Sequence, residues 1–289
     1  MDRNGKTIPS PRLVGTVHRD PRGKAKLLGL LQQEQPSAIS VEISPYARIF
    51  RAQRSAAFRA TLRENLKRIH EEEKFSWREI FSHSAIRGIF FLLKEPYEWR
   101  AAEAYARQKG IVLVDIDLSR YSEERLSHLP ELVSGENLRA LLRLSSPDLT
   151  EEIKAHYNRA RFLFSHPPSL WPQGPEERER ETFMAEGIRR LVRQARGQKV
   201  LHIGGWEHLL EIPGGSSLYE LLKDLRPTRA LLSEAHKPGK AIYGGTGKRE
   251  PGCFHKNCEK AVEKFSNRRH NLIELQQFMK TAYFLVNKK

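Results

Sequence analysis

Short apolar runs alternate with longer amphipathic segments along most of the chain. The apolar runs are four to six residues long and rich in Val, Ile and Leu, which is typical of β-strands buried in a sheet. In the run I-V-L-V-D-I the apolar positions are nearly continuous, and this predicts a strand buried on both faces. The predicted strands are residues 12–17, 38–43, 111–116, 199–203 and 230–233.

The longer segments carry apolar residues at helical spacing. Phe58, Leu62 and Leu66, for example, recur every four residues within the segment 46–73 and predict one buried face of a long helix. Gly110 follows the segment 97–109 and is a typical residue just beyond a helix, because glycine adopts the left-handed conformation at little cost. The other predicted helices are residues 23–33, 76–93, 176–196 and 218–225, with two or three more within 121–164.

Strands alternating with helices predict an α/β fold with a central, mostly parallel sheet flanked by helices. The length of 289 residues is enough to bury a core without disulfide bonds. Residues 1–11 are polar and contain two prolines, so we expect a disordered tail, followed by an α/β domain over residues 12–233. Residues 234–289 are predicted to form a glycine- and lysine-rich linker and a basic helical C-terminal tail.

The composition narrows the cellular setting more than the activity. The formal net charge of +15 allows an anionic partner such as nucleic acid, but basic residues are spread along the whole chain, which favours an ordinary solvated surface. Two cysteines do not make a disulfide scaffold and fit a reducing compartment. The N-terminus lacks an apolar leader, and the longest apolar run, I-F-F-L-L, is too short to span a bilayer. We therefore expect a soluble, cytoplasmic protein without a transmembrane segment.

Residues that could take part in catalysis or metal binding lie at the carboxyl ends of the predicted strands. His18 follows the first strand, Glu42 ends the second, Asp115 and Asp117 end the third, and His208 follows the fourth. Because the carboxyl ends of parallel strands share one edge, we expect these side chains to meet there. Two histidines and several carboxylates can bind a divalent metal or polarise a water molecule.

Each of these residues also has an ordinary structural explanation. A lone histidine commonly caps a loop, Glu42 could pair with Arg48, and Asp115 could cap a helix or form a salt bridge. The coincidence across four strands is what favours a functional site.

Five short motifs, in order, resemble the TraB-domain family, a group related to the TIKI proteases, the erythromycin esterases and the ChaN haem-binding proteins. The resemblance covers roughly residues 12–225. The motifs are G-T-V-H at 15–18, V-E-I at 41–43, D-I-D-L at 115–118, E-R-E-T-F-M at 179–184 and G-W-E-H at 205–208.

The resemblance implies a hydrolase whose active site contains His18, Glu42 and His208, with Arg180 as an accompanying charge. Glu42 or the histidine pair would deprotonate water, and Arg180 would stabilise negative charge on the substrate oxygen. Some related proteins are metal-dependent peptidases, for which His18, Glu42 and His208 would be the metal ligands. Others activate water without a metal, and others bind haem, so the resemblance does not fix the reaction.

The sequence allows more than one kind of binding partner. We expect Asp115, Asp117 and Arg48 to contact a substrate, which could be a peptide or a small molecule. The first alternative is a non-catalytic protein that binds a divalent metal or, less in keeping with the residues, haem. The second is a basic anion- or nucleic-acid-binding protein, although no nucleic-acid motif supports it.

Two minor patterns lie in the C-terminal region. Cys253 and Cys258, with His255 between them, could form a small zinc site, but the usual short-spaced cysteine pair is absent. The sequence G-G-T-G-K resembles a phosphate-binding loop but lacks the required earlier glycine, because Ile242 stands there, and Arg249 replaces the Ser or Thr that would hold Mg²⁺.

Overall fold

A computed structural model describes residues 10–146, 148–168 and 173–235. All of them belong to one unit of the chain, Met1–Gly244. The predictions for the basic C-terminal tail, for Cys253 and Cys258 and for the glycine-rich loop concern residues outside these ranges, as does most of the predicted N-terminal tail.

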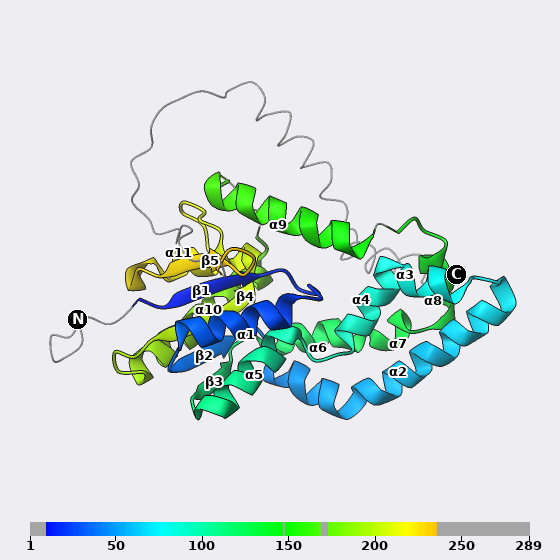
Figure 1. Cartoon of the computed structure of the whole chain (residues 1–289), viewed down its shortest axis with the longest axis horizontal. Helices are drawn as coiled ribbons and strands as arrows, with labels where there is room; N and C mark the ends of the chain where they lie inside the picture. Colours follow the sequence, from blue (N-terminus) through cyan, green and yellow to red (C-terminus); the bar gives the residue numbers. More distant parts are fainter. Residues whose placement is uncertain (1–9, 147, 169–172, 236–289) are drawn as a thin grey trace, which may run out of the picture. The chain divides into compact units, whose positions relative to one another are not determined.

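The described residues form a five-stranded sheet in which every neighbouring pair of strands is parallel, so the α/β prediction is confirmed (Figure 1). The strand order is β3-β2-β4-β1-β5. Parallel neighbours need long crossovers, and the amphipathic segments between the strands supply them as helices. The strands are β1 (Arg12–Thr16), β2 (Ala38–Val41), β3 (Val112–Asp115), β4 (Val200–Gly205) and β5 (Thr228–Leu231).

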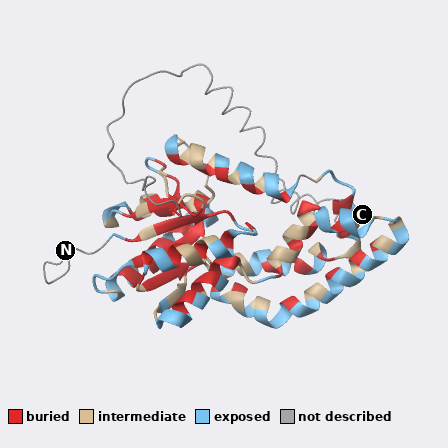
Figure 2. Cartoon of the chain, viewed as in Figure 1, coloured by how far each residue is buried: buried red, intermediate tan, exposed pale blue. Residues whose placement is uncertain are grey.

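Helices cover both faces of the sheet. One face carries α1 (Gly23–Glu34) and α5 (Tyr97–Lys109), which contact each other. The other carries α10 (Pro175–Gln194) and α11 (Leu218–Leu221), and α9 (Leu149–Ser165) shares their hydrophobic core (Figure 2). Two 3₁₀ helices, η1 (Trp206–Leu209) and η2 (Lys223–Leu225), flank α11 in the described chain.

A second group of helices is inserted after β2 and β3. The long α2 (Pro45–Glu73) contacts α6 and α8, and α4 contacts α3 and α8. Ser44 caps the first turn of α2 by accepting a hydrogen bond from the backbone N–H of Ala47. The remaining members are α3 (Trp77–Ser82), α4 (Ser84–Leu92), α6 (Ser119–Ser127), α7 (Leu129–Leu132) and α8 (Gly135–Leu142).

The prediction that the third strand is buried on both faces is wrong. β3 pairs only with β2 and lies at the edge of the sheet. Val112 is 55% exposed, and the three following residues are only partly buried. An apolar run indicates a strand but does not indicate its place in the sheet. The fully buried strands are β2 and β4, at the second and third places of the sheet.

Three further details of the helices and strands differ from the predictions. The predicted helix 76–93 is two helices, because His83 has an extended backbone between α3 and α4. The region 121–164 contains parts of four described helices rather than two or three. The last strand ends at Leu231 rather than at residue 233. Within the described ranges, no helix is long and apolar enough to cross a membrane.

Candidate active site

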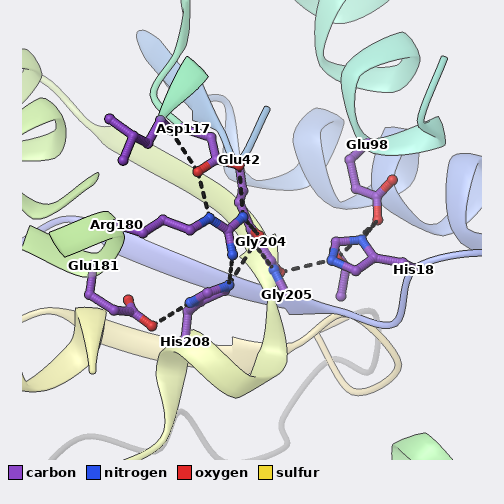
Figure 3. Close-up of polar contacts among 11 residues, drawn as sticks. His18, Glu42, Glu98, Asp117, Arg180, Glu181, Gly204, Gly205 and His208 are labelled. Atoms are coloured by element: carbon purple, nitrogen blue, oxygen red, sulfur yellow. Dashed lines mark hydrogen bonds and ion pairs between the residues drawn. The ribbon is translucent and has the colours of Figure 1, made fainter. Parts of the chain in front are cut away.

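The structure brings the predicted site residues together at the carboxyl edge of the sheet (Figure 3). His18 follows β1, Glu42 follows β2, and His208 lies in η1 directly after β4. Arg180 reaches the same place from α10, and Asp117 from the segment after β3. The parallel strand order therefore places these residues side by side, although 190 positions separate His18 from His208 in the sequence.

His18, Glu42 and His208 all lie next to Gly205. A methyl group on its α-carbon would lie 3.1 Å from Nε2 of His18, 3.4 Å from Oε2 of Glu42 and 3.5 Å from Cδ2 of His208. Its backbone N–H donates to Oε2 of Glu42 over 2.5 Å. The glycine is therefore needed here for close approach rather than for an unusual backbone angle, since its φ is −60°.

His18 is held by a buried carboxylate. Its Nδ1 lies 2.8 Å from Oε1 of Glu98, whose side chain is 5% exposed, whereas the His18 side chain is 55% exposed. The Thr16 hydroxyl lies 3.1 Å from the same carboxylate oxygen. Glu98 accepts the Nδ1–H, so the tautomer with a free Nε2 is favoured. Desolvation favours neutral His18, but the Glu98 carboxylate outweighs it and raises the pKa of His18 above 6.5.

The loop that carries His18 is fixed from several sides. The Tyr97 hydroxyl donates to the carbonyl oxygen of Val17 over 3.2 Å. Asp20 accepts a hydrogen bond from the Tyr157 hydroxyl over 3.0 Å and one from the backbone N–H of Arg22 over 2.9 Å. These contacts come from α5, from α9 and from the start of α1, so the position of the imidazole is determined by three packed helices.

Arg180 is the centre of a charged network behind Gly205. Its Nε and Nη2 donate to the two carboxylate oxygens of Asp117 over 2.6 and 2.7 Å, a bidentate arrangement. Its Nη2 also donates to Oε1 of Glu42 over 2.5 Å. Burial raises the pKa of Glu42, but His208 and Arg180 more than offset it, and the net pKa lies well below 4.5. Glu42 is therefore an ionised carboxylate with both oxygens engaged.

His208 lies between two carboxylates. Its Nδ1 is 2.5 Å from Oε1 of Glu181, and its Nε2 is 3.0 Å from Oε1 of Glu42. Burial opposes the charged form, but Glu181 and Glu42 outweigh it and raise the pKa of His208 well above 6.5. Both ring nitrogens therefore carry protons and donate. Nη1 of Arg180 approaches Nε2 at 3.3 Å, and the surrounding carboxylates offset the repulsion between the two cations.

These donors do not fit a divalent metal as they are arranged. Glu42 already accepts from Arg180 and from a backbone N–H, and both nitrogens of His208 are engaged by carboxylates. A metal ligand needs a free lone pair; doubly protonated His208 has none, and the Glu42 oxygens are already shared among three donors. Among the described residues, no group of three His, Cys, Asp or Glu side chains is placed to hold a metal ion.

The predicted substrate residues form internal contacts. Nη1 of Arg48 donates to Asp115 over 2.7 Å, and the Arg48 guanidinium stacks on Trp99 at 3.8 Å from the ring centroid. Asp117 holds Arg180 and also accepts from the backbone N–H of Leu118. Asp115 thus forms the salt bridge that was its alternative explanation, and contact of these residues with a substrate stays a prediction.

Two residues of the site are missing from the sequence prediction. Glu98 lies in the first turn of α5, 80 positions from His18, and belongs to no motif. Glu181 adjoins Arg180 in the sequence E-R-E, so the motif contains it, but its role as the partner of His208 needs the fold. His202, in β4, is fully buried with Nδ1 3.1 Å from the Ser40 hydroxyl.

No family model, curated protein or solved structure matches the chain. The TraB-domain resemblance therefore depends on the five short motifs alone and stays a prediction. The geometry of the site is therefore the basis for its proposed chemistry.

Proposed function

We propose that the protein is a hydrolase in which His18, supported by Glu98, activates a water molecule for attack on a carbonyl carbon. One observation carries the proposal: an imidazole that is 55% exposed has one nitrogen bound to a buried carboxylate at 2.8 Å. A carboxylate in this position fixes the tautomer and stabilises the imidazolium that forms when the other nitrogen takes a proton. The free Nε2 is therefore the proton acceptor.

The proposed reaction conserves atoms and charge. Nε2 of His18 takes a proton from water while the oxygen of that water bonds to the carbonyl carbon of an ester or amide. The resulting imidazolium is paired with the Glu98 carboxylate. It then returns the proton to the leaving oxygen or nitrogen as the bond to the carbonyl carbon breaks. The products are a carboxylic acid and an alcohol or amine, and His18 is again neutral.

Glu42 and His208 are weaker candidates for the base. Each Glu42 oxygen already accepts a charge-assisted or backbone hydrogen bond, and its pKa lies well below 4.5. His208 carries a proton on each nitrogen and has no lone pair to offer. We therefore assign the base to His18 and a positioning role to the other two.

Arg180 has a related positioning role. Its Nε and Nη2 are committed to Asp117 and Glu42, so few of its hydrogens remain for a substrate oxygen. Together Arg180 and His208 carry two positive charges against the three negative charges of Glu42, Asp117 and Glu181. This network fixes the carboxyl ends of β2 and β4 and the helix α10 around Gly205. Because Glu42 and His208 already form hydrogen bonds within the site, we propose that the reaction needs no metal ion.

A panel of chromogenic esters and peptide amides tests the proposal. Wild-type protein, His18→Ala and His166→Ala are compared, the last removing an exposed imidazole whose Nδ1 bonds to the carbonyl oxygen of Phe162 in its own helix. We expect hydrolysis by wild type and by His166→Ala, and a loss of about 10²–10⁴-fold in His18→Ala. Hydrolysis that survives in His18→Ala, or no hydrolysis by wild type of any member of the panel, would contradict the proposal.

A further inference from the structure

Basic side chains lie near the loop that carries His18. Arg19 is the next residue in the chain, and His156 of α9 is close enough to Arg19, Arg159 and His18 for their charges to act on it. Burial, followed by the charges of Arg19, Arg159 and His18, lowers the pKa of His156 to about 4. Among the groups that shift this pKa there is no carboxylate. The charges that act on His156 are therefore all positive.

Arg19 is held in an uncommon conformation. Its φ is 70°, in the left-handed region that residues other than glycine rarely adopt. Such a conformation costs about 1 kcal/mol or more, and surrounding structure has to maintain it. Its guanidinium lies against α4, because Nη1 would be 3.1 Å from a β-carbon on Gly88. The loop that carries His18 therefore directs Arg19 towards α4 rather than into free solvent.

Arg19 has no anionic partner within the described part of the chain. Arg19 is partly buried, and no hydrogen bond or ion pair of its side chain is found there, nor of the His156 side chain. The positive charge of a partly buried guanidinium is unfavourable without a counter-charge. A carboxylate or phosphate, which accepts hydrogen bonds from the guanidinium, is its natural partner.

The carboxylates of the site cannot fill this role. Glu42, Asp117 and Glu181 are bound by Arg180 and His208 behind Gly205. Asp20 is bound by Lys26 and Tyr157, and Glu98 by His18. The carboxylates of the site are thus paired with other side chains, whereas the Arg19 guanidinium has no such partner among the described residues.

We propose that the substrate carries an oxyanion, a carboxylate or phosphate, close to its scissile bond, and that Arg19 binds this group. This inference depends on the proposed hydrolase function, since it places the substrate relative to His18. Arg19 supplies the paired charge and bidentate geometry that an oxyanion prefers. His156, neutral because its pKa is low, adds a hydrogen-bond donor.

A matched pair of esters tests the inference. The neutral ester is 4-nitrophenyl acetate, and the anionic ester is 4-nitrophenyl hydrogen succinate, which has the same leaving group. The rate of each ester without enzyme is measured and subtracted, because the succinate carboxylate attacks its own ester bond. We expect wild type to favour the succinate ester in kcat/KM by about tenfold or more, equivalent to about 1.4 kcal/mol. In Arg19→Ala the preference for the succinate ester disappears, and Arg19→Lys keeps part of it. A preference that survives in Arg19→Ala overturns the inference.

Arg54→Ala is the charge-matched control. Arg54 is an exposed residue of α2, so this variant changes the net charge equally without altering the loop after β1. Retention of the preference in Arg54→Ala shows that the effect is local. Equal kcat/KM values for both esters in wild type, with both lost in His18→Ala, overturn the inference and leave the hydrolase function standing. Loss of neither ester in His18→Ala contradicts the hydrolase function itself.

Binding provides a readout that does not need turnover. Monomethyl succinate and inorganic phosphate are titrated into wild type and Arg19→Ala while the imidazole resonances are followed by NMR. We expect saturable shifts of His156 in wild type and a rise of its pKa from about 4, because a bound anion favours the charged ring. Absence of binding to wild type, or equal binding to Arg19→Ala, overturns the inference whichever esters are hydrolysed.

Discussion

Nδ1 of His18 lies 2.8 Å from Oε1 of Glu98, and the two side chains differ in exposure, at 55% and 5%. The carboxylate is thus inside the protein and the imidazole at its surface. This relationship gives His18 one nitrogen with a fixed proton and one nitrogen free for a substrate or water. The predictions below follow from it and from the charged network behind Gly205.

Glu98→Gln removes the charge that supports His18. The pKa of His18 should fall, because the carboxylate that raises it is gone. The rate of ester hydrolysis should decrease by about 10²–10⁴-fold, because the amide does not fix the tautomer or stabilise the imidazolium. The base must be unprotonated, so the wild-type rate should rise with pH through a pKa above 6.5, and the residual rate of the variant should rise at lower pH.

Glu103→Gln is the matched control for this variant. Glu103 lies on the same helix and pairs with Arg107 at the surface. Its replacement should change neither the rate nor the pH profile. An unchanged profile in Glu98→Gln as well would remove Glu98 from the mechanism.

Gly205→Ala should reduce activity without unfolding the protein. The backbone of Gly205, at φ −60° and ψ 139°, suits alanine, but the new methyl group would lie 3.1 Å from Nε2 of His18. We expect a loss of about tenfold or more in kcat and a change in stability of about 1–2 kcal/mol. Urea unfolding and kinetics on the same samples separate the two effects, with Gly135→Ala on α8 as a variant that should alter neither strongly. Full activity of Gly205→Ala would mean that the reacting atoms lie elsewhere.

Glu181→Gln should destabilise the protein by about 3–5 kcal/mol near neutral pH, because it leaves part of a buried ion pair without its partner. The folded pKa of His208 lies well above its ordinary value of 6.5. Its protonation therefore contributes stability that is complete below pH 6.5 and is lost as pH rises through the folded pKa. Urea unfolding at increasing pH should show the difference between wild type and variant shrinking. A constant difference would indicate that His208 is not the protonated group.

His202 should make the protein sensitive to acid. Burial lowers its pKa to about 4, so the unfolded chain binds a proton between pH 6.5 and about 4 that the folded chain does not. Stability should therefore fall as pH decreases through this interval. In His202→Asn the slope should be smaller by up to about 1.4 kcal/mol per pH unit. Equal slopes for the two proteins would contradict a neutral His202.

Metal removal should have no effect on the proposed reaction. Both oxygens of Glu42 and both nitrogens of His208 already form hydrogen bonds, so EDTA should leave both the rate and the thermal midpoint unchanged. Activity that disappears with chelator and returns with one divalent metal would restore the metal-dependent alternative.

Much of the fold was predictable because hydrophobic periodicity and glycine caps are local features. The helix 97–109 has the predicted bounds, and Gly110 ends it at φ 64° in the left-handed conformation. The break at His83 was not predicted, because the surrounding apolar residues continue the helical pattern across it. The edge position of β3 was also not predicted, because strand order is set by long-range packing rather than by composition.

The site shows the same division between local and long-range information. His18, Glu42 and His208 could be found because each follows or ends a predicted strand, and parallel strands share an edge. Glu98 could not be found, because it enters the site from the first turn of a helix far along the chain. The engagement of Glu42 by Arg180 is equally invisible in the sequence, and it decides which residue is free to act as the base.

Chemical rescue of His18→Ala tests the assignment of the base most directly. The His18 side chain is 55% exposed, so removing it should leave a position that free imidazole can reach from solvent. Ester hydrolysis is measured for wild type and His18→Ala with and without added imidazole, and the rate of imidazole in buffer alone is subtracted. We predict that the variant is about 10²–10⁴-fold slower than wild type and that imidazole restores part of the activity in a saturable way. Hydrolysis by His18→Ala at the wild-type rate without imidazole would contradict the account.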